Sequence, residues 1–197
     1  MSSRVLDAEG WFIDARRVAS PNCDPRPADT AISLVVIHGI SLPPGEFGGG
    51  HVEALFQNRL DPDTHPYFRE IAALRVSAHL FVRRDGELVQ FVPCALRAWH
   101  AGASCWDGRE RCNDFSIGIE LEGTDSILYA DAQYGTLLDV LRALVPRYPI
   151  QAIAGHAHVA PGRKTDPGPA FEWQRLRAVF PGLSIPAAAA GGEDDVG

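Results

Sequence analysis

The sequence predicts a single α/β domain. Its 197 residues, 46% of them hydrophobic, are enough to bury one substantial core. The run Ile32–His38 is β-branched and continuous, as in a strand that is covered on both faces. Residues Asp131–Tyr148 instead repeat apolar side chains at helical spacing. These three observations place strands and helices in one domain.

The first part of the chain is expected to be extended before it enters the sheet. Residues 1–31 become rich in proline at Ser20–Asp29, so we expect this segment to lie across the surface. The strand at Ile32–His38 follows and breaks at a stretch rich in glycine and proline. His38 is therefore placed at the carboxyl end of a strand, facing a long loop.

The middle of the chain predicts one helix and three strands. Apolar spacing favours a helix over His65–Val76. Residues Ser77–Val92 predict two strands joined at Asp85-Gly86, a dipeptide typical of tight hairpin turns. Phe115–Gly123 predicts another core strand, which the carboxylate of Glu120 interrupts.

The long C-terminal helix should begin at Asp131, which can cap it, and run to about Tyr148. Its apolar stripe is typical of a core face; it consists of Tyr134, Leu137, Leu138, Leu141, Leu144 and Val145. A short strand at Gln151–His156 follows.

The stretch 154–171 is too broken by glycine and proline to continue as helix or strand. Pro169 can then begin a helix through Phe180, with Trp173 on its apolar side. The tail has little to pack, so we expect a domain over 1–183 and disorder over 184–197.

Charge and composition exclude several classes of function. A net charge of −7 argues against a phosphate-binding surface, so we expect no nucleic-acid partner. The N-terminus lacks the apolar segment of a signal peptide, and no stretch suits a membrane span, so we expect a cytoplasmic protein. We also expect a monomer. Four cysteines without a CxxC pair fit reduced thiols; they are Cys23, Cys94, Cys105 and Cys112.

Two histidines and an aspartate form the first candidate site. His38 and His156 end separate predicted strands, and Asp166 lies in the loop after the second strand. Together they would supply three protein ligands to one metal ion, the number common in catalytic zinc sites. Spacing leaves alternatives open, because a histidine at a strand end could be a hydrogen-bonded surface residue and Asp166 could initiate a turn. His158, two residues after His156 in an extended segment, would point to the same side and compete as a ligand.

Two further charged residues are candidates for catalysis. Glu120 lies in a run otherwise fit for burial, where an ionised carboxylate needs a partner or a function. The alternative is a salt bridge to an arginine. Lys164 lies two residues before Asp166 in the same loop, and the alternative there is ordinary solvation.

Six segments follow one another between about Gly10 and Phe180: "VVIHGISLPPGEFGG", "RVSAH", "RRDGELVQFVP", "RAWHAG", "GRERCNDFSIGIELEGTD" and "GHAHVAPGRKTDPGPAF". Together they resemble the AmpD-type 1,6-anhydro-N-acetylmuramyl-L-alanine amidases. These belong to the zinc amidase family that also contains phage lysozyme-type amidases and peptidoglycan recognition proteins. The resemblance implies a mixed β-sheet flanked by helices, with the site at one edge of the sheet.

The resemblance also implies residue roles. It assigns zinc ligation to His38, His156 and Asp166, and catalysis to Glu120 and Lys164. Substrate contacts are implied for Arg75, Trp99, His100 and Arg111. Arginine suits the carboxylates of a peptide and an indole suits the face of a sugar, although Trp99 could be core and either arginine could pair with surface acids.

This sequence departs from the family pattern at two places. Gly39 stands where relatives often have asparagine, and His158 where they often have an acidic residue. These departures concern substrate hydrogen bonding and the electrostatics of the loop that carries Lys164 and Asp166.

The implied activity is hydrolysis of the amide between the lactyl group of (1,6-anhydro)-N-acetylmuramic acid and L-alanine in muropeptides. It would serve cytoplasmic peptidoglycan recycling and remove an inducer of β-lactamase. One alternative is a peptidoglycan-binding module without catalysis, although a binder needs no general base such as Glu120. The other is a zinc hydrolase of a different amide.

Overall fold

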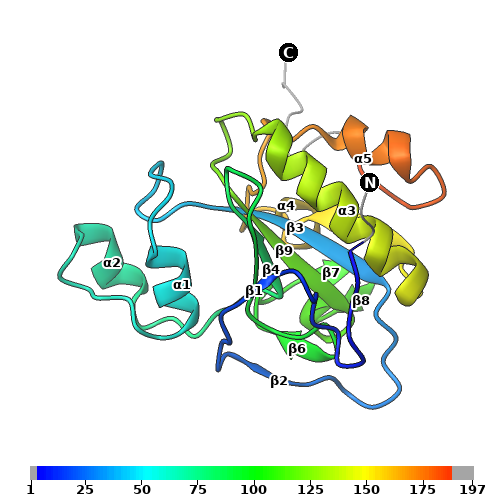
Figure 1. The fold of residues 1–197 in the computed structure, drawn as a ribbon, viewed down its shortest axis with the longest axis horizontal. Coiled ribbons are helices and arrows are strands. Elements are labelled where there is room, and N and C mark those ends of the chain that lie inside the picture. Colours follow the sequence, from blue (N-terminus) through cyan, green and yellow to red (C-terminus); the bar gives the residue numbers. More distant parts are fainter. Residues whose placement is uncertain (1–3, 188–197) are drawn as a thin grey trace.

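The computed structural model describes residues 4–187 and has a mixed sheet of six strands, with helices packed on its faces (Figure 1). The strand order is β1-β5-β4-β9-β3-β10. The strands are β1 (Arg16–Arg17), β3 (Leu34–Ile40), β4 (Leu80–Val82), β5 (Leu88–Gln90), β9 (Ser116–Glu122) and β10 (Ala152–Gly155). Strands β4, β9, β3 and β10 are parallel, whereas β5 pairs antiparallel with β4. The predicted α/β class and the mixed sheet are confirmed.

Alternation along β9 separates two kinds of side chain. Ile117, Ile119 and Leu121 enter the large core under α3 (Asp131–Arg147) and α5 (Trp173–Val179). The intervening positions, which include Ser116 and Glu120, point to the opposite face, because successive side chains of a strand alternate. All seven residues of β9 are buried, so the polar set on that face lies inside the protein.

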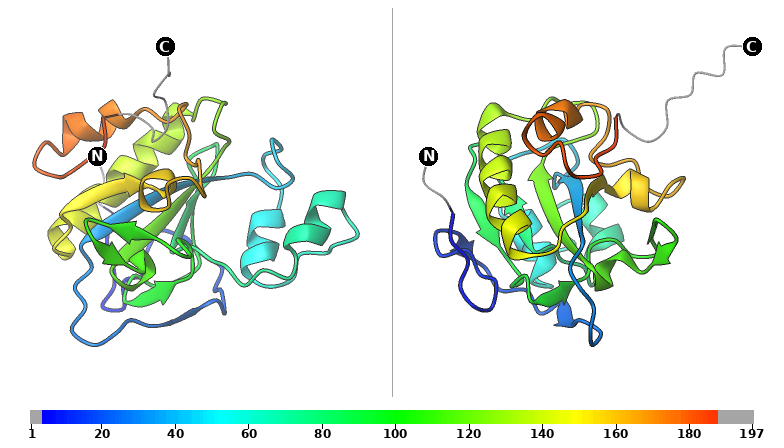
Figure 2. Two further views of the ribbon diagram at one scale, coloured as in Figure 1. Left: turned by 180° about the vertical axis from the view of Figure 1, so that it is seen from behind. Right: turned by 90° about the vertical axis from the view of Figure 1, so that its right-hand side faces the viewer.

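Two short helices cover the sheet on the face opposite α3. They are α1 (His51–Phe56) and α2 (Pro66–Ile71), and they lie side by side away from α3 (Figures 1 and 2). Phe56 and Phe68 pack there with Phe81 of β4 and Val89 of β5. The helix expected over 65–76 is shorter: it ends at Ile71, and Leu74, which follows it, is exposed.

The N-terminal segment contributes more than surface. Phe12 is fully buried in the large core, and Arg16–Arg17 forms the edge strand β1. Further on, β2 (Cys23–Pro25) pairs antiparallel with β6 (Leu96–Ala98). The N-terminal segment is thus anchored in the core by an aromatic side chain, while most of Ser20–Asp29 lies at the surface, as expected.

The predicted hairpin is confirmed with shorter strands. Leu80–Val82 and Leu88–Gln90 pair antiparallel around Asp85-Gly86, where Gly86 adopts a φ of +89°. A second two-stranded ribbon joins β7 (Cys105–Trp106) to β8 (Arg109–Glu110), followed by a 3₁₀ turn at Cys112–Asp114.

Both C-terminal helices begin elsewhere than expected. Asp131 is the first helical residue of α3 rather than its cap, and its carboxylate pairs with Arg175 at 2.6 Å. The N–H of Ala130, at the cap position, is accepted by the Gln133 side chain instead. Helix α5 starts at Trp173 and not at Pro169, because residues 165–171 form successive turns.

The expected disorder from Ser184 onward is wrong for the first residues of the tail. Ser184 forms a parallel bridge with Ala152, exchanging backbone hydrogen bonds with Gln151 and Ile153. Arg177 donates to the carbonyl of Ala187 at 2.8 Å. The remainder of that prediction, residues 188–197, lies outside the described residues.

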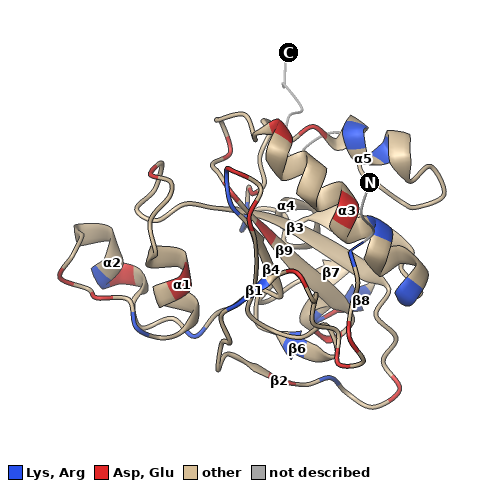
Figure 3. Ribbon diagram, viewed as in Figure 1, with Lys and Arg blue, Asp and Glu red and all other residues tan. Residues whose placement is uncertain are grey.

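Acidic and basic residues are interspersed over the fold (Figure 3). Arg16 of β1, for example, lies 2.7 Å from both Glu53 of α1 and Glu87 near β5. Within residues 4–187, no helix has the length and apolar character needed to span a membrane.

Candidate metal centre

Adjacent strand ends bring two histidines together. His38 is the fifth residue of β3, and β3 pairs in register with both β9 and β10. Gly155 of β10 lies opposite Ile37, so His156, the next residue, comes beside His38. The Nδ1 atoms of the two histidines are 3.0 Å apart.

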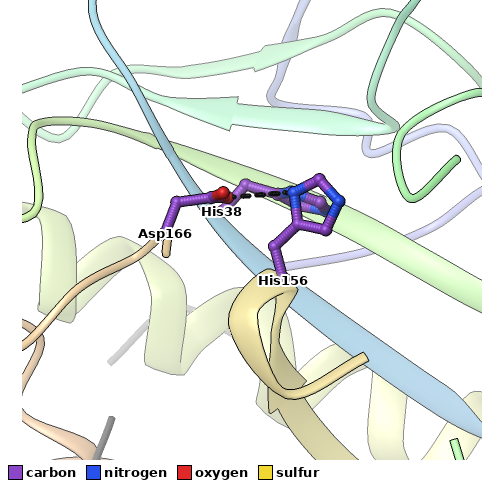
Figure 4. Close-up of side chains that lie close together, drawn as sticks. All are labelled: His38, His156 and Asp166. Carbon is purple, nitrogen blue, oxygen red and sulfur yellow. Dashed lines mark hydrogen bonds and ion pairs between the residues drawn. The ribbon is translucent and has the colours of Figure 1, made fainter. Parts of the chain in front are cut away.

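Asp166 completes the cluster from the following loop. Its Oδ2 atom lies 3.2 Å from Nδ1 of His38 and 3.2 Å from Nδ1 of His156. The three side chains point toward one another in Figure 4, and their potential ligand atoms all lie within 4.8 Å. The residues that we predicted as metal ligands from the sequence are thus within reach of one ion.

His158 does not compete for this position. Residues His156–Val159 form the short helix α4, where we expected a broken loop. Residues two positions apart in a helix are rotated by about 200° from each other, so His156 and His158 face opposite sides of α4. Nδ1 of His158 accepts the N–H of Gly155 at 3.1 Å, and its ring lies edge-on to Trp173. The expectation that His158 points to the same side as His156 is wrong.

The loop that carries Asp166 is held at two backbone positions. The carbonyl of Asp166 accepts the N–H of Ala157 at 2.9 Å, and the carbonyl of Pro167 accepts the hydroxyl of Tyr129 at 2.9 Å. Tyr129 also accounts for Gly39, because a Cβ at Gly39 would lie 2.3 Å from the tyrosine oxygen. A larger residue at position 39 would therefore require this tyrosine to move.

Protonation states in the cluster suit a cation. Burial, with His156 nearby, lowers the pKa of His38 to about 4, so its imidazole is neutral at pH 7. Burial alone would raise the pKa of Asp166, but its close contacts with the rings of His156 and His38 outweigh burial and hold that pKa below its usual range. Neutral histidines and an ionised carboxylate are the forms that bind a metal.

Glu120 lies directly beside the cluster. It is opposite His38 in the register of β9 and β3, and its Oε1 atom is 4.0 Å from Nδ1 of His38. Its side chain is 10% exposed, and its Oε2 atom is buried without a hydrogen-bond partner. Among the described residues no arginine pairs with it, so the salt-bridge alternative is wrong. Burial, together with the negative charge of Asp166, raises the pKa of Glu120 well above its usual value.

A cleft of about 560 Å³ opens onto these residues. Its polar wall includes His38, Glu120, His156, Lys164 and Asp166. Its apolar wall is formed from the loop after β3 and from α1 and α2, including Leu42, Phe56, Tyr67, Ile71 and Leu74. Lys164, the only lysine of the chain, is exposed at this cleft.

The residues expected to contact substrate are more scattered. Arg75 is exposed and donates to the carbonyls of Ala73 and Leu74. Trp99 is half-buried and donates from Nε1 to Asp24 at 3.2 Å. Arg111 pairs with Asp114 at 3.2 Å and borders a second hollow of about 510 Å³. As the structure stands, none of these three lines the cleft of the cluster.

His100 lies against His38 and also lines the cleft. Its Nδ1 atom is 3.0 Å from Nε2 of His38, and its Nε2 atom is 3.2 Å from Oγ of Ser116. Both ring nitrogens are therefore engaged within the protein, although His100 also lines the cleft, so the substrate contact expected from the sequence stays a prediction. The sequence analysis missed Ser116, although the period of two along β9 places it on the same face as Glu120.

Buried histidines make the stability of the metal-free protein depend on pH. Burial lowers the pKa of His38 to about 4 and of His79 to about 3, and it lowers that of His100 strongly. The unfolded chain, with a histidine pKa near 6.5, then binds protons that the folded chain does not. Stability is full above about pH 6.5 and falls toward pH 4, by up to about 1.4 kcal/mol per pH unit for each histidine.

Urea unfolding with a chelator at pH 7.0 and 5.5 measures this loss. The His79→Gln variant should show a smaller loss by one histidine's share. Equal free energies of unfolding at the two pH values in the wild-type protein would contradict buried neutral histidines.

Comparison with known proteins agrees with the geometry. The family model of N-acetylmuramoyl-L-alanine amidases matches residues 28–169. The 1,6-anhydro-N-acetylmuramyl-L-alanine amidase AmpD of Citrobacter freundii is 62% identical over 177 residues, which cover 89% of this chain and 94% of that protein. AmpD of Escherichia coli strain K12 is 61% identical, with 89% and 97% of the two chains covered.

Solved structures show the same relation. The crystal structure of a selenomethionine derivative of AmpD has a TM-score of 0.86 and 62% identity, covering 89% of this chain and 98% of the other. The amidase AmiD of E. coli, in complex with the substrate anhydro-N-acetylmuramic acid-L-Ala-D-γ-Glu-L-Lys, has a TM-score of 0.56 and 29% identity, covering 93% and 67%. The AmpD-type resemblance of the sequence is confirmed. The chain therefore belongs to the N-acetylmuramoyl-L-alanine amidase family and is an amidase of its AmpD-type branch.

Proposed function

We propose that this amidase is zinc-dependent and cleaves the bond between the lactyl group of 1,6-anhydro-N-acetylmuramic acid and L-alanine in muropeptides. The observation that carries the proposal is the convergence of His38, His156 and Asp166 beside the buried carboxylate of Glu120, whose Oε2 atom has no hydrogen-bond partner. The substrate class is supported by the names of the AmpD relatives and by the muropeptide bound to AmiD.

The donor set fits zinc. Two imidazole nitrogens and one carboxylate oxygen would hold the ion, and three protein ligands leave a fourth position for water. The carbonyl of Ala101, 3.3 Å from Nε2 of His156, can only accept a hydrogen bond, so the ring proton of His156 is on Nε2 and Nδ1 is free to ligate. When bound, zinc supplies a Lewis acid that lowers the pKa of water toward about 7 and polarises a carbonyl.

Glu120 is placed to move the protons of the reaction. Its carboxylate takes a proton from the attacking water and later delivers it to the amine that leaves. Of the cleft's carboxylates outside the proposed ligand set, Glu120 and Asp125, only Glu120 is buried. Its raised pKa, caused first by burial, makes it a stronger base than a solvated carboxylate.

Lys164 is placed to stabilise charge that develops on the attacked carbonyl. Its ammonium stands in the same cleft as Glu120 and His38, and its positive charge opposes the rise in the pKa of Glu120 that burial causes. An oxyanion donor in a partly dry site contributes about 3–4 kcal/mol to the transition state.

The Lys164→Met variant should lower kcat by about a hundredfold while KM and zinc content stay near their wild-type values. A surface cation without a catalytic role contributes less than about 1 kcal/mol, so the two possibilities are well separated. Steady-state kinetics with anhydro-muropeptide provides the measurement, and Arg177→Met, on α5, is the control. A raised KM at unchanged kcat would make Lys164 a substrate-binding residue only.

We place this reaction in cytoplasmic peptidoglycan recycling, where it would also remove an inducer of β-lactamase. We propose a monomer without nucleic-acid or membrane partners, in keeping with the net charge of −7 and the mixed charges on the fold.

Incubation with purified anhydro-muropeptide, with and without a zinc chelator, tests the proposed function. Mass spectrometry should find the free anhydro-sugar and the intact peptide, and the chelator should abolish both products. Shortened peptides would instead indicate a hydrolase of another amide. Binding of the muropeptide without products would indicate a recognition module.

A further inference from the structure

We propose that His100 is a positioning residue: a hydrogen-bond chain from the carbonyl of Cys112 through Ser116 and His100 determines which ring nitrogen of His38 faces the metal. The inference rests on the proposed zinc site. Its members are buried, with His38 at 1%, Ser116 at 0% and His100 at 9% exposure. The chain is therefore a property of the folded protein and not of its hydration shell.

The direction of the chain is set at its inner end. Oγ of Ser116 lies 2.5 Å from the carbonyl oxygen of Cys112. A carbonyl can only accept, so the single hydroxyl proton of Ser116 points to Cys112. At 3.2 Å on the other side, Nε2 of His100 must then donate to a lone pair of Ser116. His100 consequently carries its ring proton on Nε2.

The same logic reaches the metal centre. A neutral imidazole carries one ring proton, so Nδ1 of His100 is a bare acceptor. It lies 3.0 Å from Nε2 of His38, which must donate to it. Nδ1 of His38 is then without a proton on the side where Asp166 and His156 converge. A metal ligand needs this form, because a proton on Nδ1 would occupy the position of the ion.

The backbone of β9 is shaped for this ring. A Cβ at Gly118 would lie 2.4 Å from Cγ of His100, so the imidazole lies directly on the strand where glycine leaves room. Ser116, Gly118 and Glu120 share one face of β9. That face thus carries the proposed base at one end and the anchor of the hydrogen-bond chain at the other.

One short segment serves both proposed histidine ligands. Nδ1 of His100 accepts a hydrogen bond from Nε2 of His38, and the carbonyl of Ala101 accepts one from Nε2 of His156 at 3.3 Å. Oδ1 of Asn113 accepts the backbone N–H of His100 at 3.2 Å and of Ala101 at 2.8 Å, which fixes the segment. We infer that residues 100–101 orient both imidazoles before the metal arrives.

Nitrogen NMR of the histidine rings tests the direction of the chain in the wild-type protein. With zinc bound, we expect ring protons on Nε2 of His100 and on Nε2 of His38, both exchanging slowly, and a bare Nδ1 on His100. A ring proton on Nδ1 of His100 would reverse the chain and overturn the inference. This measurement needs no variant, so it does not depend on how a substitution folds.

Zinc affinity, measured by competition with a chromogenic chelator, tests the consequence. His100→Leu removes the acceptor and should weaken binding by about 10–100-fold. His100→Asn, whose side-chain oxygen can take the place of Nδ1, should recover affinity to within about threefold of wild type. His51→Leu, on α1 and away from the cluster, is the control and should bind like wild type.

The outcomes separate this inference from the proposed function. Zinc binding by the wild-type chain that is indifferent to His100→Leu overturns the positioning role alone. A wild-type chain that binds no zinc overturns the proposed function and the inference with it. A loss of affinity in His100→Leu that His100→Asn does not recover points to packing and also overturns the positioning role.

Discussion

Replacing His38 by alanine is expected to abolish zinc binding and amidase activity together. His38 offers the Nδ1 atom that lies within 3.2 Å of both other proposed ligands, so its loss leaves two donors where a catalytic zinc site commonly has three. The substitution also removes the hydrogen bond between Nε2 of His38 and Nδ1 of His100. Elemental analysis and a hydrolysis assay on the same sample provide the measurement.

His158→Ala is the matched control for this experiment. His158 is on the same short helix as His156, but it faces Gly155 and Trp173 rather than the cluster. We expect full zinc content and nearly full activity in this variant, with some loss of thermal stability from the lost contact. Loss of zinc in His158→Ala, with retention in His38→Ala, would show that the metal lies elsewhere.

Glu120→Gln should lower kcat by about 10²–10⁴-fold while zinc stays bound. The change keeps the size of the side chain and removes only the ability to take a proton. The expected loss in kcat is the usual contribution of a general base. Because Oε2 of Glu120 has no hydrogen-bond partner in the structure, little structural cost is expected from the neutral amide. Steady-state kinetics and metal analysis of the purified variant test both parts.

Glu122→Gln provides a control on the same strand and the same face. Glu122 is 4% exposed, but its carboxylate accepts the N–H of Gly48 at 2.6 Å and of Arg84 at 3.0 Å, so its role is to hold two loops. We expect reduced stability and a change in kcat of less than about threefold. Near wild-type turnover in Glu120→Gln would make Glu120 a structural partner of His38.

The sequence by itself determined the elements whose pattern is local. Three local patterns indicate which side chains are buried: the β-branched run before His38, the alternation around Glu120 and the apolar stripe of α3. The core strands and the long helix could therefore be predicted from the residues. The ordered family segments added the identity of the site, and they indicated His38, His156 and Asp166 before any distance was known.

Helix ends and short elements were harder to predict from the sequence. Asp131 was expected to cap α3, but Ala130 is at the cap position. The Gln133 side chain accepts the N–H of Ala130, and the carboxylate of Asp131 accepts a hydrogen bond from Arg175 instead. The helix α4 is only four residues long and follows a strand directly, so it is too short for a periodic apolar pattern to predict it. Such boundaries depend on partners that are distant in the sequence.

Only the tertiary structure decided the relations that cross the sheet. It separated His156 from His158, because α4 turns the second histidine toward Trp173. It placed a ring nitrogen of His100 3.0 Å from His38, and it explained Gly39 by the close approach of Tyr129. The physical reason is the same in each instance: a hydrogen bond or a steric contact between strands is set by register and packing, and neither is visible in the spacing of residues along one chain.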